Sequence, residues 1–201
     1  MITFKNISKV FNKNKDNQFT LFQDLNLTVN EGDFISLLGS NGSGKSTLLN
    51  VLCGTETIDE GALYIGTESI TPLPSFERFK RISRVYQDPT VGTAPHLTVY
   101  ENLVLALNKG NLFNLRLLGK SDKALILKEL EKLNMGLEQK VDVPVKELSG
   151  GQRQALSLLM ALMNEPDILL LDEHTAALDP KSSKHIMKLT HEMVKERKLT
   201  T

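Results

Sequence analysis

A glycine-rich stretch in the first quarter of the chain has the residue types that bind phosphate. Residues 39–47, GSNGSGKST, match the pattern G-x-x-x-x-G-K-[ST] and follow the apolar segment FISLL. Glycines let successive backbone N–H groups turn toward one phosphate, and the N-terminus of a following helix adds partial positive charge. We call this stretch the phosphate loop. It is expected to hold a nucleoside triphosphate through Gly39, Ser40, Asn41, Gly42, Ser43, Gly44, Lys45, Ser46 and Thr47.

Two side chains of this loop have distinct chemical tasks. The Lys45 ammonium can reach the outer phosphates of the nucleotide, and the Ser46 hydroxyl can bind Mg²⁺. A plain glycine turn before a helix would explain the glycines, but it would not require the lysine and serine at these positions. The sequence therefore predicts ATP or a related nucleotide, with Mg²⁺, as the ligand.

Two acids follow a short apolar run further along the chain, in ILLLDEH at residues 168–174. Ligands of open α/β sheets lie at the carboxyl ends of the strands. Asp172 is therefore expected to hold the Mg²⁺ that bridges the phosphates, directly or through water. Glu173 is expected to orient or deprotonate the attacking water. No serine or cysteine nucleophile in a supporting motif accompanies His174, so we interpret it as a packing residue and not as a general base.

A second glycine-rich stretch, LSGGQ at residues 148–152, also precedes helical sequence. Ser149, Gly150 and Gly151 offer a hydroxyl, backbone N–H donors and a helix dipole, which suit a γ-phosphate. A helix cap followed by a turn would account for the same residues without any ligand. We call residues 148–152 the second glycine loop. One loop is enough to hold a nucleotide, so the presence of two needs an explanation.

The surrounding sequence predicts the elements that carry these residues. β-branched and apolar patterns indicate strands over residues 1–11, 22–29, 34–38, 61–66, 81–87 and 166–173. Helical spacing indicates helices over residues 46–53, 99–108, 121–134, 150–164 and 180–197. Gly54 suits the end of the first helix, and Asp179 followed by Pro180 suits the start of the last one. The pattern is that of an α/β domain with a mostly helical insertion.

Composition excludes several classes of protein. The 24 lysines and arginines balance 24 aspartates and glutamates, which argues against a nucleic-acid binder. The single cysteine, Cys53, excludes an internal disulfide and a thiolate metal cluster. The longest apolar runs, ALSLLMALM and DILLLD, are too short to cross a bilayer, and the first residues lack the apolar core of a secretion signal. A role at a membrane would require another protein.

Five motifs occur in the order found in ATP-binding cassette (ABC) ATPases: GSNGSGKST, YQD, LSGGQRQ, ILLLDE and ALDP. The resemblance covers essentially the whole chain. It implies a P-loop NTPase cassette of the ABC type, with a RecA-like core sheet flanked by helices, an antiparallel β part and an inserted helical subdomain. The single domain would span residues 1–201, with the core in 1–88 and 165–201 and the helical part in about 89–164.

The resemblance explains the second glycine loop. In ABC ATPases two subunits pack head to tail, and each ATP lies between the phosphate loop of one subunit and the LSGGQ loop of the other. One ATP is too small to use both loops of one chain, whereas a second copy can close over it with two-fold symmetry. ATP then holds the dimer together and hydrolysis releases it. The loop residues implied to contact the partner's ATP are Ser149, Gly150, Gly151 and Gln152.

Three further positions match functional residues of the family. Gln87 resembles the glutamine that contacts Mg²⁺ and the attacking water, and Asp179 resembles the aspartate that crosses the dimer interface. Phe11 lies where the family has an aromatic ring that stacks on adenine, although a core aromatic would explain it equally well. Residues 87–107 resemble the region where importers touch their membrane subunits.

The chain departs from the family pattern in two places. His174 stands where the family usually has proline, which changes the stiffness of that loop. The chain ends in KERKLTT, before the final strand and the switch histidine of the family. We therefore expect a C-terminally truncated chain that binds ATP but hydrolyses it slowly.

The sequence as a whole predicts the ATP-hydrolysing subunit of a solute transporter with a separate permease. The resemblance is to importers, and in residues 87–95 to ATPases paired with permeases of the branched-chain amino acid kind. The expected partners are a second copy of the chain, the permease and a solute-binding protein, and not nucleic acid. The expected location is the cytoplasm, at the inner face of the cell membrane. The alternative is a soluble ABC ATPase acting in translation or DNA repair, which would carry two cassettes or a long coiled coil. A GTPase or kinase would have no use for LSGGQ.

Overall fold

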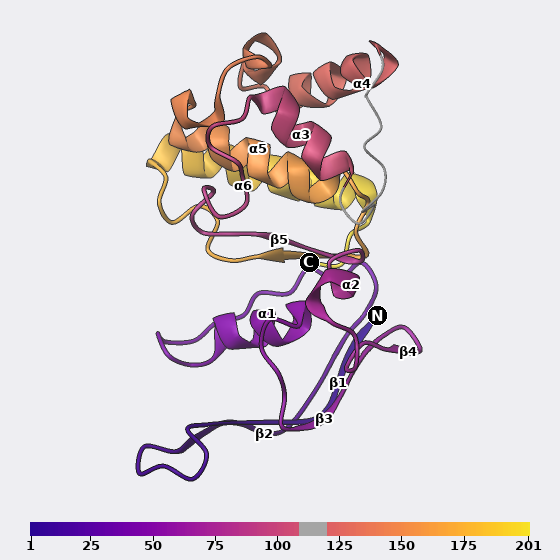
Figure 1. The fold of residues 1–201 in the computed structure, drawn as a ribbon, viewed down its shortest axis with the longest axis vertical. Coiled ribbons are helices and arrows are strands. Elements are labelled where there is room, and N and C mark those ends of the chain that lie inside the picture. Colours follow the sequence, from indigo (N-terminus) through magenta and orange to yellow (C-terminus); the bar gives the residue numbers. More distant parts are fainter. Residues whose placement is uncertain (109–119) are drawn as a thin grey trace. The chain divides into compact units, whose positions relative to one another are not determined.

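The computed structural model describes residues 1–108 and 120–201, which divide into two units. The first unit comprises Met1–Ile82 with Leu199–Thr201, and the second comprises Ser83–Lys198. Figure 1 labels most of the helices and strands. The predicted division into residues 1–88 with 165–201 and residues 89–164 stays a prediction. Residues 109–119 of that helical part lie outside the described residues.

An antiparallel sheet of four strands forms the base of the first unit. The strands are β1 (Ile2–Phe11), β2 (Phe19–Val29), β3 (Glu60–Ile65) and β4 (Glu68–Ser69), in the order β2-β1-β3-β4. Ile2 pairs with Val29 on one side and with Ile65 on the other. Alternate side chains are buried, as expected for a sheet with one covered face: Ile2, Phe4, Leu63 and Ile65. The sheet confirms the predicted antiparallel β part.

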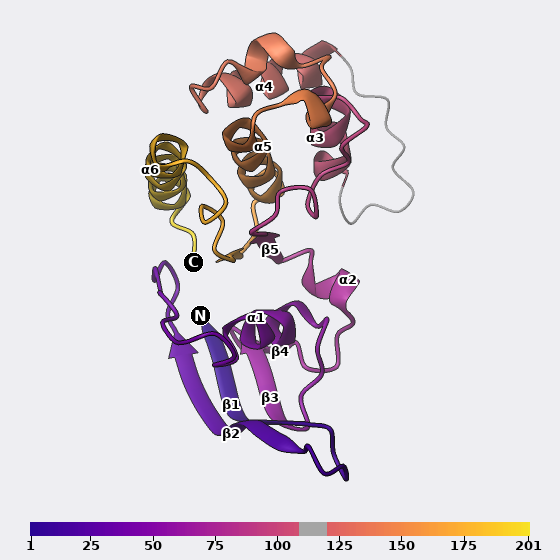
Figure 2. The same cartoon turned by 90° about the vertical axis from the view of Figure 1, so that its left-hand side faces the viewer.

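Helix α1 (Lys45–Cys53) lies beside this sheet, and a short helix, α2 (Ser75–Arg78), follows it in the chain (Figures 1 and 2). α1 ends at Gly54, whose φ of 72° is left-handed and favours glycine, as the sequence predicted. The buried Arg78 guanidinium donates hydrogen bonds to the carbonyl oxygens of Val51, Leu52 and Leu73. Positive charge at these carbonyls stabilises the C-terminal end of α1.

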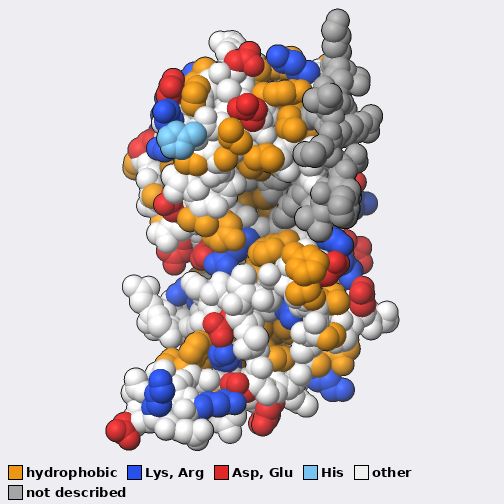
Figure 3. Space-filling model, in the orientation of Figure 1, with side chains coloured by type: hydrophobic (Ala, Val, Ile, Leu, Met, Phe, Trp, Pro, Cys, Tyr) orange, Lys and Arg blue, Asp and Glu red, His pale blue; other side chains and the backbone are white. Residues whose placement is uncertain are grey.

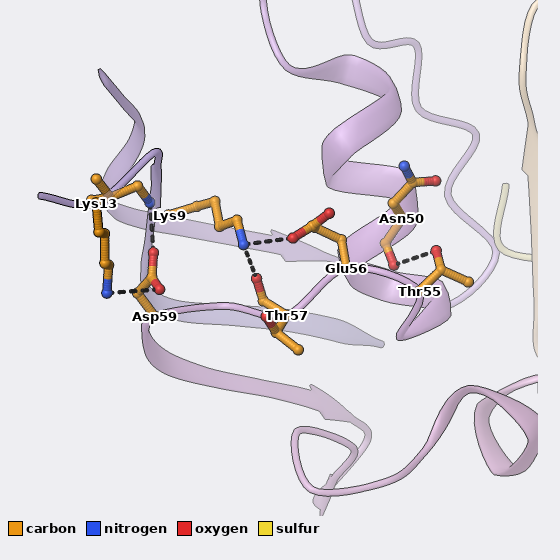
Figure 4. A network of polar contacts seen from close by, with 8 residues as sticks. Lys9, Lys13, Asn50, Thr55, Glu56, Thr57 and Asp59 are labelled. Atoms are coloured by element: carbon orange, nitrogen blue, oxygen red, sulfur yellow. Dashed lines mark hydrogen bonds and ion pairs between the residues drawn. The ribbon is translucent and has the colours of Figure 1, made fainter. Parts of the chain in front are cut away.

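A polar network ties the segment after α1 to strand β1 (Figure 4). The Lys9 ammonium, which is almost fully buried, donates to Glu56 Oε1 at 2.6 Å and to the Thr57 carbonyl at 2.8 Å. Asp59 accepts from the Val10 backbone N–H and pairs with Lys13. These contacts tie residues 56–59 to strand β1 and to the loop that follows it.

Residues 34–38 differ from the prediction of a buried strand. The structure assigns no strand there, and Phe34 and Leu38 are 49% and 93% exposed. Ile35 N–H donates to the Thr201 carbonyl and Thr201 N–H to the Asp33 carbonyl, which is the pattern of parallel pairing. The prediction of a buried strand is therefore wrong for these residues, because a strand needs hydrogen-bonding neighbours along its length and not only an apolar pattern. Among the described residues, the parallel pairing of this segment consists of the two hydrogen bonds with Thr201.

The second unit contains two short strands and a group of helices. Strands β5 (Ile82–Val85) and β6 (Ile168–Leu171) form a two-stranded sheet. The helices are α3 (Val99–Leu107), α4 (Lys120–Glu131), α5 (Gly150–Leu162) and α6 (Pro180–Arg197), with 3₁₀ turns η1 (Leu137–Lys140) and η2 (Val145–Glu147). α5 contacts α3, α4 and α6 (Figure 2). Its buried leucines therefore form the centre of the unit's core: Leu156, Leu158, Leu159 and Leu162.

The surface carries charges of both signs. In the face shown in Figure 3, acidic and basic side chains are interspersed among apolar and polar ones on both units. Among the described residues, no helix has the length and apolar character needed to cross a membrane.

Candidate functional site

The phosphate loop leads directly into helix α1 in the first unit. Gly42 and Gly44 have φ values of 84° and 93°, a left-handed conformation that glycine adopts without strain. Gly44 is the N-cap residue of α1, and no side chain caps the helix there. Its α-carbon also lies close to β2, because a Cβ at this position would stand 3.1 Å from the Phe22 ring. The helix start therefore keeps N–H donors that an anion can use.

The Lys45 side chain folds back over the phosphate loop. Its ammonium group donates to the Gly39 carbonyl at 2.8 Å and to the Ser40 carbonyl at 3.1 Å. Neutral carbonyls are weaker partners for a cation than a charged phosphate oxygen. The ammonium group is thus held above the loop, where a phosphate group would meet it.

Phe11 belongs to an aromatic pair on the edge of the antiparallel sheet. It lies opposite Phe19 in the strand register, and the two rings stack with centroids 5.4 Å apart. The Lys9 ammonium lies 4.9 Å from the centroid of the Phe11 ring. Phe19 is 51% exposed and Phe11 is partly exposed, so neither ring is a core residue. The sequence analysis did not single out Phe19. Phe19 could have been found from the sequence, because Phe11 and Phe19 stand at the two ends of the polar loop of residues 12–18.

Asp172 and Glu173 follow strand β6 in the second unit. Asp172 N–H donates to the Val85 carbonyl, which joins the ends of β5 and β6. The Asp172 carboxylate forms an ion pair with Arg84 on β5. Glu173 is exposed, with a φ of 43° that is unusual for a residue other than glycine. Glu165 and Lys198 have similar φ values, so this conformation does not single out Glu173, and its catalytic role stays a prediction.

His174 is a buried side chain of the second unit. It is 5% exposed, and its Nε2 atom lies 3.2 Å from the Thr190 hydroxyl oxygen. The Thr190 hydroxyl donates its own proton to the Ile186 carbonyl, so it accepts from His174 Nε2–H. Burial lowers the pKa of His174 below its ordinary value of 6.5. A neutral, buried and hydrogen-bonded ring agrees with the packing role predicted for it.

The stability of the fold is expected to depend on pH through His174. The pKa of this ring is lower in the folded than in the unfolded chain, so unfolding takes up a proton at acidic pH. Its stabilising contribution is complete above about pH 6.5 and declines as the pH falls toward the folded-state pKa. The free energy of unfolding, measured with urea, should therefore fall less between pH 7.5 and pH 5.5 for His174→Gln than for the wild-type chain. The exposed His191 provides the control for the substitution itself, and His191→Gln should have the wild-type stability at pH 7.5.

The second glycine loop is the N-terminus of helix α5. The Ser149 hydroxyl accepts from Gln152 N–H, and Gln152 Oε1 accepts from Ser149 N–H, which together form a capping box. The Gln152 side chain also accepts from the Lys140 ammonium and donates to the Met135 carbonyl. Gln152 therefore orders the loop from within the chain. Ser149 and Gly150 are exposed, which leaves them accessible to a ligand.

The two glycines of this loop differ in the space around them. A Cβ on Gly151 would lie 3.1 Å from Ser182 Oγ, whereas a Cβ on Gly150 would meet only a Leu178 methyl at 3.6 Å. Gly151→Ala should therefore be less stable than Gly150→Ala, by about 1–3 kcal/mol if Ser182 cannot move away. Chemical denaturation of both variants measures this difference. Equal stability of the two variants would show that the Ser182 side chain moves away from the added methyl group without cost.

Gln87 and Asp179 also lie in the second unit. Gln87 is exposed, just beyond the end of β5. The preceding carbonyl, of Tyr86, accepts from the buried Gln154 side chain on α5, a contact that the sequence analysis missed. Asp179 caps α6 by accepting from Lys181 N–H and Ser182 N–H, which confirms the predicted cap. Hydrogen bonding from Ser182, first through its side chain and then through its backbone N–H, lowers the pKa of Asp179.

The predicted site residues thus divide between the units. The phosphate loop and Phe11 belong to the first unit, while Gln87, the second glycine loop, the acid pair and Asp179 belong to the second. A model of the ABC transporter family matches residues 22–176, a stretch that contains motifs of both units. The chain belongs to the ABC transporter family.

Individual relatives agree with this assignment. The tyrosine transport ATP-binding protein of Clostridioides difficile is 44% identical over 201 residues, which are the whole of this chain and 80% of that protein. The spermidine/putrescine import ATP-binding protein PotA of Haemophilus influenzae is 35% identical over 187 residues, 92% of this chain. The match spans 46% of PotA, about half of its length.

Solved cassettes have the same fold. The ATP-binding cassette MJ0796, in a dimeric post-hydrolysis structure bound to ADP and Pi, superimposes with a TM-score of 0.79. The two chains are 32% identical, and the match covers 98% of this chain and 84% of that one. A second dimeric structure of MJ0796 has a TM-score of 0.78. The predicted fold class is confirmed, and the chain is an ABC-type ATPase that powers transport.

Proposed function

We propose that this chain binds ATP with Mg²⁺, hydrolyses it between two copies of itself, and so powers solute uptake through a separate permease. The observation that carries the proposal is the presence of two phosphate-type loops at helix N-termini, at α1 and at α5. A single nucleotide requires only the first of them. The second is explained when it serves the nucleotide of a partner copy, and the similar solved cassettes are dimers, which supports this proposal.

The roles proposed for individual residues follow from their chemistry. Residues 39–47 cradle the phosphates, with Lys45 on the outer ones. Mg²⁺ prefers oxygen ligands. The Ser46 hydroxyl, the Gln87 amide and the Asp172 carboxylate supply oxygens of this kind, so these three would hold the ion. Mg²⁺ neutralises charge on the phosphates.

Glu173 is the proposed base or orienting group for the attacking water, and Gln87 assists it. The Glu173 carboxylate is exposed and can therefore accept a proton from water. Phe11, with Phe19 beside it, offers a ring for stacking on adenine. Ser149, Gly150 and Gly151 meet the partner's γ-phosphate, Gln152 orders that loop, and Asp179 lies at the interface between copies.

The proposed partners are a permease, a solute-binding protein and a second copy of this chain. We place the chain in the cytoplasm, at the inner face of the cell membrane. The name of the relative from Clostridioides difficile suggests an amino acid as the solute. A permease of the branched-chain amino acid kind and slow hydrolysis stay predictions.

Affinity purification of this protein from detergent-solubilised cells tests the transport role. A membrane protein with several spans, recovered in stoichiometric amount, is the expected result. Recovery of ribosomal or DNA-repair proteins without a membrane partner would instead support the soluble ABC ATPase considered from the sequence. A Lys45→Met bait is the matched control, because loss of ATP binding should not remove the permease contact.

A further inference from the structure

An ion pair occupies the carboxylate that is proposed to bind Mg²⁺. Arg84 Nη2 lies 2.5 Å from Asp172 Oδ2, and the two side chains are only 9% and 23% exposed. The residues come from neighbouring strands, because Asp172 N–H donates to the Val85 carbonyl where β5 and β6 lie side by side (Figure 1). The backbone thus holds the arginine next to the acid.

A second contact keeps Arg84 in this position. Its guanidinium carbon lies 4.9 Å from the centroid of the ring of Tyr86, the residue that follows strand β5, which is a cation–π contact. The neighbouring residues Ile82 and Val85 are fully buried, so the strand itself is anchored in the core. An arginine in an otherwise core-facing strand, with two specific contacts, is therefore fixed by the fold.

The guanidinium and a metal ion would compete for the same oxygen. Both are cations, and a charge-assisted bond of this length in a partly buried place is strong. Mg²⁺ dehydrates reluctantly and needs well-placed oxygen ligands. A carboxylate whose charge is already balanced by arginine attracts Mg²⁺ less than an unpaired one.

We propose that Arg84 is a positioning residue that holds Asp172 and restrains it from taking Mg²⁺ until the nucleotide arrives with the metal. This inference rests on the proposed function, and specifically on Asp172 as a metal ligand. When ATP brings Mg²⁺ to the site, Asp172 exchanges its arginine partner for the ion. Arg84 stays close to the Tyr86 ring and returns to Asp172 after the products leave.

Metal affinity, measured apart from turnover, tests this inference. All variants carry Glu173→Gln so that ATP is not consumed, and Mn²⁺ replaces Mg²⁺ because its free form gives an electron paramagnetic resonance signal. In the full 201-residue chain with ATP, Arg84→Gln should lower the half-saturating Mn²⁺ concentration by about tenfold. Arg84→Lys retains a cation and should remain close to the wild-type value.

Arg81 provides a matched control, because it forms a 2.8 Å ion pair with Glu68 that is far from Asp172 in the chain. Arg81→Gln should leave the half-saturating Mn²⁺ concentration unchanged.

A half-saturating Mn²⁺ concentration of Arg84→Gln that is equal to or higher than the wild-type one overturns the inference. An arginine with a merely structural role would alter stability alone. If Arg84→Gln does not fold, Tyr86→Leu replaces it, because this variant removes only the ring contact. Tyr86→Leu should lower the half-saturating Mn²⁺ concentration to a smaller extent. If this concentration does not decrease, the inference is refuted. If the wild-type chain binds ATP equally well with and without the metal ion, the result contradicts the proposed function itself and not only the inference about Arg84.

Discussion

Replacement of Glu173 by glutamine is expected to slow ATP hydrolysis by a factor of about 10² to 10⁴, the usual contribution of a general base. Glutamine has nearly the same shape, but its amide cannot accept a proton from water. The residue is exposed and its backbone is held at a φ of 43°, so the change should remove the chemistry and leave the loop in place. Phosphate release measures the loss, and ATP binding should persist.

His174 is the matched control for this prediction, because it is the next residue in the same loop. Its ring is buried against Thr190 and lies away from solvent. His174→Ala should therefore reduce turnover by much less than Glu173→Gln when both are assayed below their unfolding temperatures. It should instead lower the unfolding midpoint, since it leaves a cavity. Equal losses of turnover in the two variants would overturn the assignment of Glu173.

Lys45→Met is expected to weaken ATP binding by about 1.5–3 kcal/mol, which corresponds to roughly 10- to 150-fold in Kd. The Lys45 ammonium is held over the phosphate loop by the carbonyls of Gly39 and Ser40. Methionine fills a similar volume but cannot form charge-assisted bonds to phosphate. Titration with a fluorescent ATP analogue measures the change in Kd.

Lys80→Met is the control for general loss of positive charge. Lys80 lies in the same unit and forms an ion pair with Glu77 on the surface. ATP affinity should be unchanged in this variant. If Lys45→Met retained the affinity of the wild-type chain, the phosphate loop would not be the nucleotide site.

Elements with strong local signals were predicted well. The structure places α6 at Pro180–Arg197, as the Asp179 cap, the proline and the helical spacing indicated. Strands β1 and β3 and the end of α1 at Gly54 also agree. In each case the cause lies within a few residues of the element. The left-handed φ values of Gly42 and Gly44 agree with a loop whose geometry depends on glycines, and the phosphate chemistry of this loop stays a prediction.

Features that depend on distant partners could not be predicted in this way. Residues 34–38 have the pattern of a strand, but the pairing that makes a strand comes from elsewhere in the chain. The Arg84–Asp172 pair joins residues 88 positions apart, and no local pattern indicates it. The internal role of Gln152 could have been predicted, because Ser149 and Gln152 have the spacing of a capping box.

The central claim is that the second glycine loop of one copy completes the ATP site of another, and mixing two inactive variants tests it most directly. Lys45→Met disables the phosphate loop. Gly150→Glu places a negative charge in the second glycine loop, at a position where the chain has room for a side chain. A mixed dimer has one site with both defects and one site with none.

The measurement is phosphate release by each variant alone and by an equal mixture, relative to the wild-type chain. The account predicts two inactive preparations that regain hydrolysis when they are mixed, because the intact phosphate loop of one copy meets the intact second loop of the other. If each chain used its own two loops, every site in the mixture would carry one defect. A mixture as inactive as its components would therefore contradict the account.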